Sequence, residues 1–169
     1  SLAHSPDVNQ QQQESPQGGQ SVAAARDVVQ HLQASGYTAY WAGGCVRDML
    51  LGLIPKDFDV ATDARPEDVL RHFPGAIEIG KSFGVIRVPC KGDYFEVATF
   101  RKDHAYEDGR HPASVSFAEP EIDAQRRDFT INAMFYDPVS ETVHDFVGGK
   151  QDLEKKLVRC VGNSEERFR

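Results

Sequence analysis

Residues 43–69 read GGCVRDMLLGLIPKDFDVATDARPEDV, and this stretch decides the fold. Residues 38–42 are expected to form a short strand that runs into the two glycines, and apolar side chains on one face of residues 45–51 predict a helix after them. A second strand is expected over residues 58–61, where apolar and polar side chains alternate. The order of strand, helix and strand predicts a mixed α/β domain.

The remainder of the chain adds helices and strands to this unit. Apolar residues recur at three- and four-residue spacing from Val22 to Leu32, which predicts an amphipathic helix that ends at Gly36. We expect further helices from Pro66 and over residues 122–127 and 152–156, and strands over residues 76–79, 85–89 and 94–100. The predicted fold is therefore α/β (α+β), with a small mixed, mainly antiparallel sheet flanked by helices.

The composition favours one globular domain. The chain has 169 residues, 40% of them hydrophobic and 27% charged, with a net charge of −7. No apolar run reaches the roughly 18–20 residues of a membrane helix, so we expect no membrane association. The scattered cysteines Cys45, Cys90 and Cys160 indicate neither a disulfide scaffold nor a zinc site, and they predict a cytoplasmic protein. Residues 1–20, rich in Gln, Ser, Pro and Gly, are expected to be a disordered polar tail before a domain at residues 21–169.

The first candidate site is the pair Gly43-Gly44 between a strand and a helix. Two residues without a Cβ allow a ligand to approach the backbone, and the helix start offers free N–H groups to a phosphate. Arg47 lies one turn into the helix and can reach the same anion. A glycine pair is also typical of a simple tight turn.

The second candidate site is Asp57-Phe58-Asp59. In a strand, residues i and i+2 project from one face, so both carboxylates would point the same way while Phe58 faces the core. Like charges side by side are unfavourable unless a cation lies between them, and hard oxygen ligands favour Mg²⁺ or Mn²⁺. Two exposed acids after a loop are the alternative interpretation.

Glu96 lies in a later predicted strand, within residues 94–100. If that strand lies beside the strand of Asp59, Glu96 becomes a third carboxylate on the metal-binding face. Otherwise it is an ordinary outward-facing acid between core residues.

The sequence RRDFTINA at residues 126–133 is the fourth candidate. Two arginines at a helix end can simply stabilise the helix dipole. In the functional interpretation, Arg127 and Asp128 turn inward to the ribose and phosphates of a nucleotide, and Asn132 lies nearby.

These strings, together with EVATFR at residues 96–101 and RRDFTINAM at 126–134, resemble the bacterial-type (class II) CCA-adding enzyme and poly(A) polymerase family. The resemblance runs from about residue 22 to Arg169. It implies the head domain of a polymerase-beta-type nucleotidyltransferase.

The resemblance also implies a role for individual residues. Asp57 and Asp59 match the metal-binding catalytic pair, and Glu96 is similar to the supporting carboxylate. The implied nucleotide-binding residues are Gly43, Gly44, Arg47, Arg127, Asp128 and Asn132, with Arg126 in support. A loop at residues 103–112 resembles the segment involved in switching nucleotide choice, with Asp103, Glu107, Asp108 and Arg110 as its candidate actors.

The implied activity is template-independent nucleotide addition to an RNA 3′ end. A tRNA 3′-hydroxyl would attack the α-phosphate of ATP or CTP, and pyrophosphate would leave, with two Mg²⁺ ions as cofactors and Mn²⁺ as a possible substitute. We favour addition of CCA, CC or A to tRNA, because Ser82 and Gly84 resemble the tRNA-specific branch. Poly(A) tailing is the alternative, because KDFDVATDA and EVATFR resemble the corresponding sequences of poly(A) polymerases.

Two other classes of function stay open from the residues alone. A binding module without catalysis would have no need of the acid pair together with Arg47 and Arg127. An enzyme that transfers nucleotides to a small molecule would share the glycines and the acid pair, but we would not expect it to carry residues 126–133.

In the family, a helical region with a base-reading motif follows a segment like residues 161–169. We therefore expect this chain to be the catalytic head without the base selector and tRNA-binding body, and we expect the isolated head to bind nucleotide weakly. The oligomeric state does not follow from the sequence.

Overall fold

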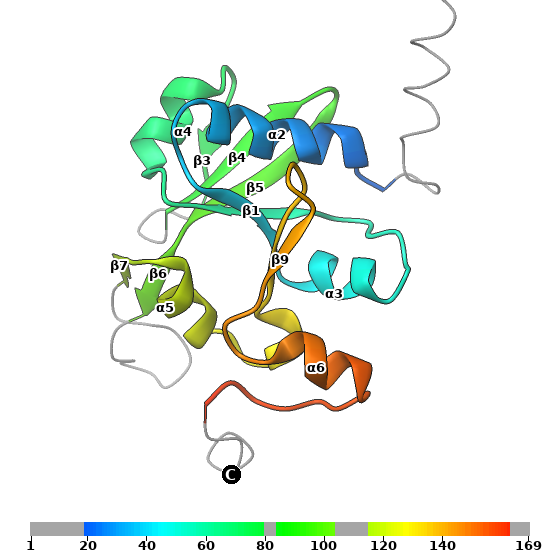
Figure 1. The fold of residues 1–169 in the computed structure, drawn as a ribbon. Helices are drawn as coiled ribbons and strands as arrows, with labels where there is room; N and C mark the ends of the chain where they lie inside the picture. The colour runs from blue at the N-terminus through cyan, green and yellow to red at the C-terminus, as the bar shows by residue number, and fades with distance from the viewer. Residues whose placement is uncertain (1–18, 80–83, 104–114, 163–169) are drawn as a thin grey trace, which may run out of the picture.

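The structure is a computed structural model that describes residues 19–79, 84–103 and 115–162. A seven-stranded sheet forms its centre (Figure 1). Its strands, in spatial order, are β3 (Ile77–Glu78), β4 (Val85–Cys90), β5 (Asp93–Thr99), β2 (Asp59–Thr62), β1 (Ala39–Ala42), β8 (Phe135–Asp137) and β9 (Thr142–His144). Within the described residues every pairing in this sheet is antiparallel except that of β2 with β5, so the predicted mixed, mainly antiparallel sheet is confirmed.

Helices cover both sides of this sheet. They are α2 (Val22–Ala34), α3 (Gly44–Leu50), α4 (Pro66–His72), α5 (Pro120–Gln125) and α6 (Gly149–Glu154), with a 3-10 turn, η3 (Thr130–Asn132). Helices α2 and α4 lie on one side, and α5 and α6 lie on the other (Figure 1). None of the helices in the described part of the chain is long and apolar enough to cross a membrane.

Helix α2 forms where the sequence predicts it, and it covers the main core. The Ser21 hydroxyl accepts the Ala24 N–H at 3.2 Å and caps the helix start. Its apolar face is fully buried against the sheet, and the indole of Trp41 on β1 donates to the Ala25 carbonyl at 3.1 Å. Phe58, just before β2, Val60 on β2 and Val97 on β5 contribute to the same core. Because this core occupies one face of β2 and β5, only the opposite face of these two strands remains for a binding site.

The opposite face of the sheet is covered only in part. A small second cluster of Ala42, Ala61, Phe100, Ala124 and Phe135 packs under β1, β2 and β8. On β4 and β5 the same face carries exposed polar and aromatic side chains. The site described below lies where the covered part of this face meets the open part.

Several element boundaries differ from those predicted. Helix α5 ends at Gln125 instead of residue 127, so both arginines follow it. Helix α6 begins at Gly149 instead of residue 152, because the Asp145 carboxylate accepts four successive N–H groups and fixes an earlier start. The hairpin of β8 and β9 was not predicted, nor was the pairing of β6 (Arg101–Asp103) with β7 (Val115–Phe117).

Candidate active site

Asp59 and Glu96 lie directly opposite each other on neighbouring strands. Parallel pairing of β2 with β5 makes them register partners, and both side chains are exposed on the open face. The adjacent Phe58 and Val60 are buried on the other side. The conditional expectation that the strand of Glu96 lies beside that of Asp59 is therefore confirmed.

Strand β2 begins at Asp59, so Asp57 precedes it, and the expectation that Asp57 and Asp59 project from one face of the same strand is wrong for Asp57. Asp57, Asp59 and Glu96 nevertheless line one cavity of about 620 Å³. This cavity brings the three predicted carboxylates to one place.

The charge around Asp59 favours a cation. Desolvation by the surrounding protein raises the pKa of Asp59, and the nearby charges of Glu96 and Asp57 raise it further, while Arg127 opposes this effect. Carboxylate oxygens are the donors that Mg²⁺ prefers, so the donor set fits a divalent metal. Within the described ranges there is no group of three or more His, Cys, Asp or Glu side chains that could hold a metal ion.

A second cavity, of about 460 Å³, opens at the start of α3. Gly43 caps this helix with φ of +80° and ψ of −142°, a backbone conformation that glycine alone adopts at low cost. A Cβ at this position would come within 4.0 Å of Asp59 Oδ2 and 3.8 Å of Arg127 Nη1. The cavity is lined by Gly43, Gly44, Arg47, Asp59, Arg126, Arg127, Asp128, Phe129 and Asn132.

Arg47 is held in this cavity from two sides. Its Nη1 donates to Asn132 Oδ1 at 2.9 Å, and its Nε and Nη2 donate to Asp48 Oδ1 at 3.1 and 3.0 Å. Arg47 and Asn132 are 85 residues apart in the chain, and both were predicted to bind the nucleotide. The structure connects them by this hydrogen bond. Asp48 was not predicted as a site residue.

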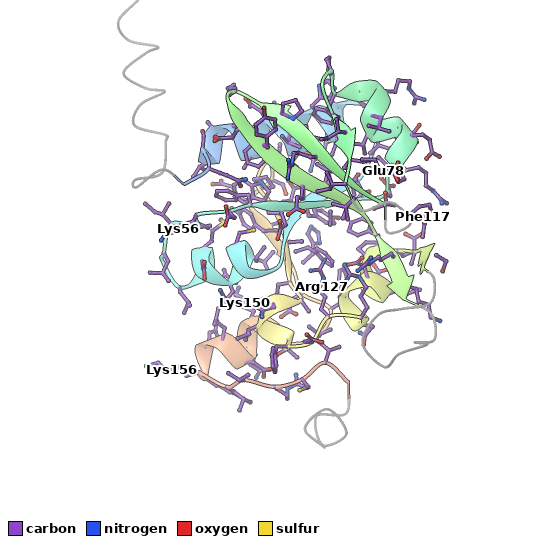
Figure 2. All side chains as sticks on the ribbon, turned by 180° about the vertical axis from the view of Figure 1, so that it is seen from behind. Lys56, Glu78, Phe117, Arg127, Lys150 and Lys156 are labelled. Carbon is purple, nitrogen blue, oxygen red and sulfur yellow. The ribbon has the colours of Figure 1, made fainter. Side chains whose placement is uncertain are left out.

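Arg127 is held by a buried acid that the sequence analysis missed. Asp123 Oδ1 accepts from Arg127 Nη2 at 2.9 Å and from Nε at 3.2 Å. Its Oδ2 accepts from the Arg101 N–H at 2.8 Å and from Arg126 Nε at 3.3 Å. Burial lowers the pKa of Arg127, an effect opposed by the charge of Asp123. Figure 2 shows Arg127 on the side of the sheet away from α2 and α4.

The segment after Arg127 is anchored from the C-terminal side. The Asp128 carbonyl accepts the Val161 N–H at 3.0 Å, and the Thr130 N–H donates to the Arg159 carbonyl at 2.9 Å. Asp152 is buried and accepts from the Thr130 hydroxyl at 2.6 Å and from Arg159 Nε at 2.9 Å. These contacts hold the cavity wall that Asp128 and Phe129 form.

Gln20 joins the Asp57 segment to β5, although it falls within the stretch predicted as a polar tail. Its main-chain N–H donates to the Lys56 carbonyl at 2.8 Å, and its Oε1 accepts the Phe58 N–H at 2.7 Å. Its Nε2 donates to the Tyr94 carbonyl at 2.6 Å. Gln20 therefore holds both residues that flank Asp57, and no signal in the Gln-rich stretch distinguishes it from its neighbours.

Two sets of predicted residues lie outside the described part of the chain. Glu107, Asp108 and Arg110 belong to residues 104–114, and Ser82 belongs to residues 80–83. Asp103 ends β6 and pairs with Val115 of β7.

Asp59 lines both cavities, so the glycine and arginine cavity adjoins the carboxylate cavity at this one residue. An anion bound beside Arg47 and Arg127 would meet a cation bound by the carboxylates at Asp59. This fold, with glycines, arginines and carboxylates converging at Asp59, is that of the nucleotidyltransferase class.

Residues 39–159 match the model of the family described as the poly A polymerase head domain, and the chain belongs to this family. A CCA-adding enzyme of Geobacillus stearothermophilus is 45% identical over 146 residues, which cover 86% of this chain and 36% of that protein. Poly(A) polymerase I of Salmonella typhimurium (strain LT2) is 42% identical over 156 residues, covering 86% of this chain and 34% of that protein.

The fold is also similar to solved structures. The crystal structure of the Bacillus stearothermophilus CCA-adding enzyme in complex with CTP matches with a TM-score of 0.76 and 41% identity. The match covers 86% of this chain and 35% of that one. The chain thus spans about a third of the length of these relatives.

Proposed function

We propose that this chain is the catalytic head of a template-independent RNA nucleotidyltransferase. It transfers a nucleoside monophosphate from ATP or CTP to an RNA 3′-hydroxyl and releases pyrophosphate. The observation that carries the proposal is the meeting of two cavities at Asp59, one with glycines and arginines and one with carboxylates. The substrate that we favour is tRNA, which would receive CCA, because CCA-adding enzymes are similar to this chain in both sequence and structure.

The nucleotide triphosphate would bind in the cavity at the start of α3. Gly43 and Gly44 leave room for phosphate beside the backbone, and Arg47 and Arg127 supply charge-assisted hydrogen bonds to it. Both guanidinium groups are already oriented by acidic or amide partners. They therefore need little reorganisation when a negatively charged ligand enters. Asp128 and Asn132 line the same cavity and are proposed to contact the sugar or phosphates.

The reacting atoms would meet at Asp59. Asp57 and Asp59 are proposed to hold two Mg²⁺ ions, or Mn²⁺, with Glu96 in support. When bound, such ions lower the pKa of the attacking hydroxyl and neutralise charge on the leaving oxygen. The RNA 3′-oxygen bonds to the α-phosphorus. The bond between the α-phosphorus and the oxygen that bridges it to the β-phosphorus breaks, and that oxygen leaves with the pyrophosphate. Arg47 and Arg127 are placed to stabilise the charge that develops on the departing pyrophosphate.

Poly(A) tailing is the second candidate. It is favoured by the 42% identity to poly(A) polymerase I of Salmonella typhimurium over 86% of this chain. The two activities share a head domain, so the catalytic residues proposed above would serve either. We propose that selection of the base depends on residues beyond this chain, and that the protein acts in the cytoplasm without membrane association.

The test uses the native protein that contains this chain. It would be offered tRNA transcripts that end before, within and after CCA, together with an unrelated RNA, and each nucleotide singly and combined. Addition that stops after CCA, or after C, CC or A, supports tRNA maturation, whereas long A-tracts on any RNA support the second candidate. Absence of any product that depends on Asp57 would refute nucleotidyl transfer.

A further inference from the structure

The carboxylate cavity has a second wall that the proposed chemistry does not use. Besides Asp57, Asp59 and Glu96, the cavity of about 620 Å³ is lined by Gln20, Phe58, Arg87, Tyr94 and Phe95. We propose that this wall binds the 3′-terminal nucleotide of the acceptor RNA, with Arg87 contacting its phosphate and Tyr94 stacking on its base. This inference rests on the proposed function and specifies where its second substrate lies.

Arg87, Glu96 and Asp59 form one row across three adjacent strands. Arg87 on β4 is the register partner of Glu96 on β5, and Glu96 is the register partner of Asp59 on β2. Residues paired in this way project from the same face of a sheet. Since neighbouring strands are about 4.8 Å apart, the backbone of Arg87 lies roughly 10 Å from that of Asp59. A long arginine side chain on this row is well placed to contact a substrate whose reacting end is at Asp59.

Arg87 differs from the arginines of the other cavity in that the described part of the chain gives it no acidic partner. Arg47 is fixed by Asp48, and Arg127 is fixed by Asp123. Arg87 is exposed, and among the described residues no hydrogen bond or ion pair to its guanidinium is found, although Glu96 faces it across the strands. Its hydrogen-bond donors therefore remain available to an anionic ligand.

Tyr94 offers an aromatic surface on the same face. It lies two residues before Glu96 on β5, so the two side chains project to the same side, and Tyr94 is 61% exposed. The neighbouring Phe95 is fully buried on the other side. Gln20 holds the Tyr94 carbonyl and so fixes this part of β5. Exposed aromatic side chains next to a cation are the usual platform for single-stranded nucleic acid.

The charges of the two cavities favour this division of substrates. The cavity at α3 is lined by three arginines and two acids, Asp59 and Asp128, and this excess of positive charge suits a triphosphate. The carboxylate cavity holds three acids and one arginine, which disfavours a triphosphate. An RNA end carries a neutral hydroxyl and a single phosphate per nucleotide, so it fits the second cavity better. With one substrate on each side, the hydroxyl and the α-phosphate meet at Asp59.

The first test measures kinetics in the native protein that contains this chain. Arg87→Gln is expected to raise the KM for RNA roughly tenfold, the effect of losing one charge-assisted hydrogen bond, while the KM for the nucleotide stays within about twofold. The matched control is Arg71→Gln, which removes the same charge from the exposed outer surface of α4. An unchanged KM for RNA, or an equal rise in the KM for nucleotide, would overturn the inference.

The second test measures RNA binding without chemistry, by fluorescence anisotropy of a labelled single-stranded oligonucleotide in EDTA. Arg87→Gln should reduce the slope of log affinity against log salt by about 0.7, the value for one phosphate contact, and Arg87→Lys should retain the slope. Tyr94→Ala should weaken binding, and Tyr94→Phe should preserve it.

The outcomes separate the inference from the proposed function. An inactive wild-type protein that binds RNA through Arg87 would refute nucleotidyl transfer and keep the RNA site. An active wild-type protein with an unchanged salt slope in Arg87→Gln would refute the RNA site alone. A fall in melting temperature with unchanged RNA affinity would assign Arg87 to a cross-strand pair with Glu96 and would also overturn the inference.

Discussion

Asp123 binds Arg127 through two hydrogen bonds to a single carboxylate oxygen, at 2.9 and 3.2 Å, four residues earlier in the chain. The acid is 1% exposed, and its second oxygen accepts the main-chain N–H of Arg101. The guanidinium also lies 5.4 Å from the centre of the Phe135 ring. Arg127 is thus oriented toward the cavity before any ligand arrives.

Replacement of Asp123 should affect both nucleotide binding and the stability of the fold. We expect Asp123→Asn to weaken nucleotide binding about tenfold and to lower the free energy of unfolding by about 1.5–3 kcal/mol, because a charged hydrogen bond is lost in a buried place. Titration calorimetry and urea unfolding measure the two effects. Asp68→Asn, at an exposed ion pair with Arg71, should cost less than about 1 kcal/mol and leave nucleotide binding intact. Equal behaviour of the two variants would contradict the role given to Asp123.

The raised pKa of Asp59 predicts that its charge destabilises the metal-free protein. A carboxyl whose pKa is higher in the folded than in the unfolded state loses stability as pH rises through that interval, and the full loss persists at neutral pH. In EDTA at pH 7, Asp59→Asn should therefore raise the melting temperature. This gain should vanish below about pH 4, the ordinary pKa of aspartate.

Asp137 provides a control of opposite sign for this pH series. Desolvation raises the pKa of Asp137, but hydrogen bonds from Gln33, Val139 and Ser140 outweigh it and leave the pKa lowered. Its stabilising contribution is present above the unfolded pKa and is lost as pH falls through the folded pKa. Asp137→Asn should accordingly lower the melting temperature at pH 7. A decrease for Asp59→Asn under the same conditions would show that its charge is not destabilising.

Gln20 should act on the metal site through Asp57. Gln20→Leu removes both side-chain hydrogen bonds and is expected to lower kcat about tenfold and to raise the half-saturating Mg²⁺ concentration, while the KM for nucleotide changes little. Steady-state kinetics over a Mg²⁺ series measure this. Gln30→Leu, on the exposed side of α2, serves as the matched control. A half-saturating Mg²⁺ concentration equal to that of the wild type would argue against a positioning role.

Gly149 is required for packing rather than for backbone freedom. A Cβ there would overlap the Thr130 carbonyl oxygen, which belongs to the backbone, and would lie 3.0 Å from Met134 Cγ. Gly149→Ala should cost about 3 kcal/mol or more in free energy of unfolding. Gly92→Ala, where φ is +86° and the space is open, should cost only about 1–2 kcal/mol of backbone strain. Chemical denaturation of both variants checks the order.

The elements that could be predicted from the sequence are those whose conformation depends on residues nearby in the chain. The strand and helix around Gly43, the start of α4 at Pro66 and the strands β4 and β5 follow from local patterns, and the structure contains them. Asp48 and Asp123 were missed because their roles depend on which arginine lies opposite, and spacing alone does not reveal this. Gln20 was missed because its partners lie 38 and 74 residues away.

The most direct test of the account is the effect of Asp57→Asn on nucleotide addition to tRNA transcripts, read at single-nucleotide resolution in the native protein. Loss of this proposed metal-binding carboxylate should slow addition by about a thousandfold or more. The melting temperature and the nucleotide affinity in EDTA should stay close to those of the wild type. An Asp57→Asn protein that folds and adds nucleotides at the wild-type rate would contradict the central claim that these carboxylates carry the chemistry.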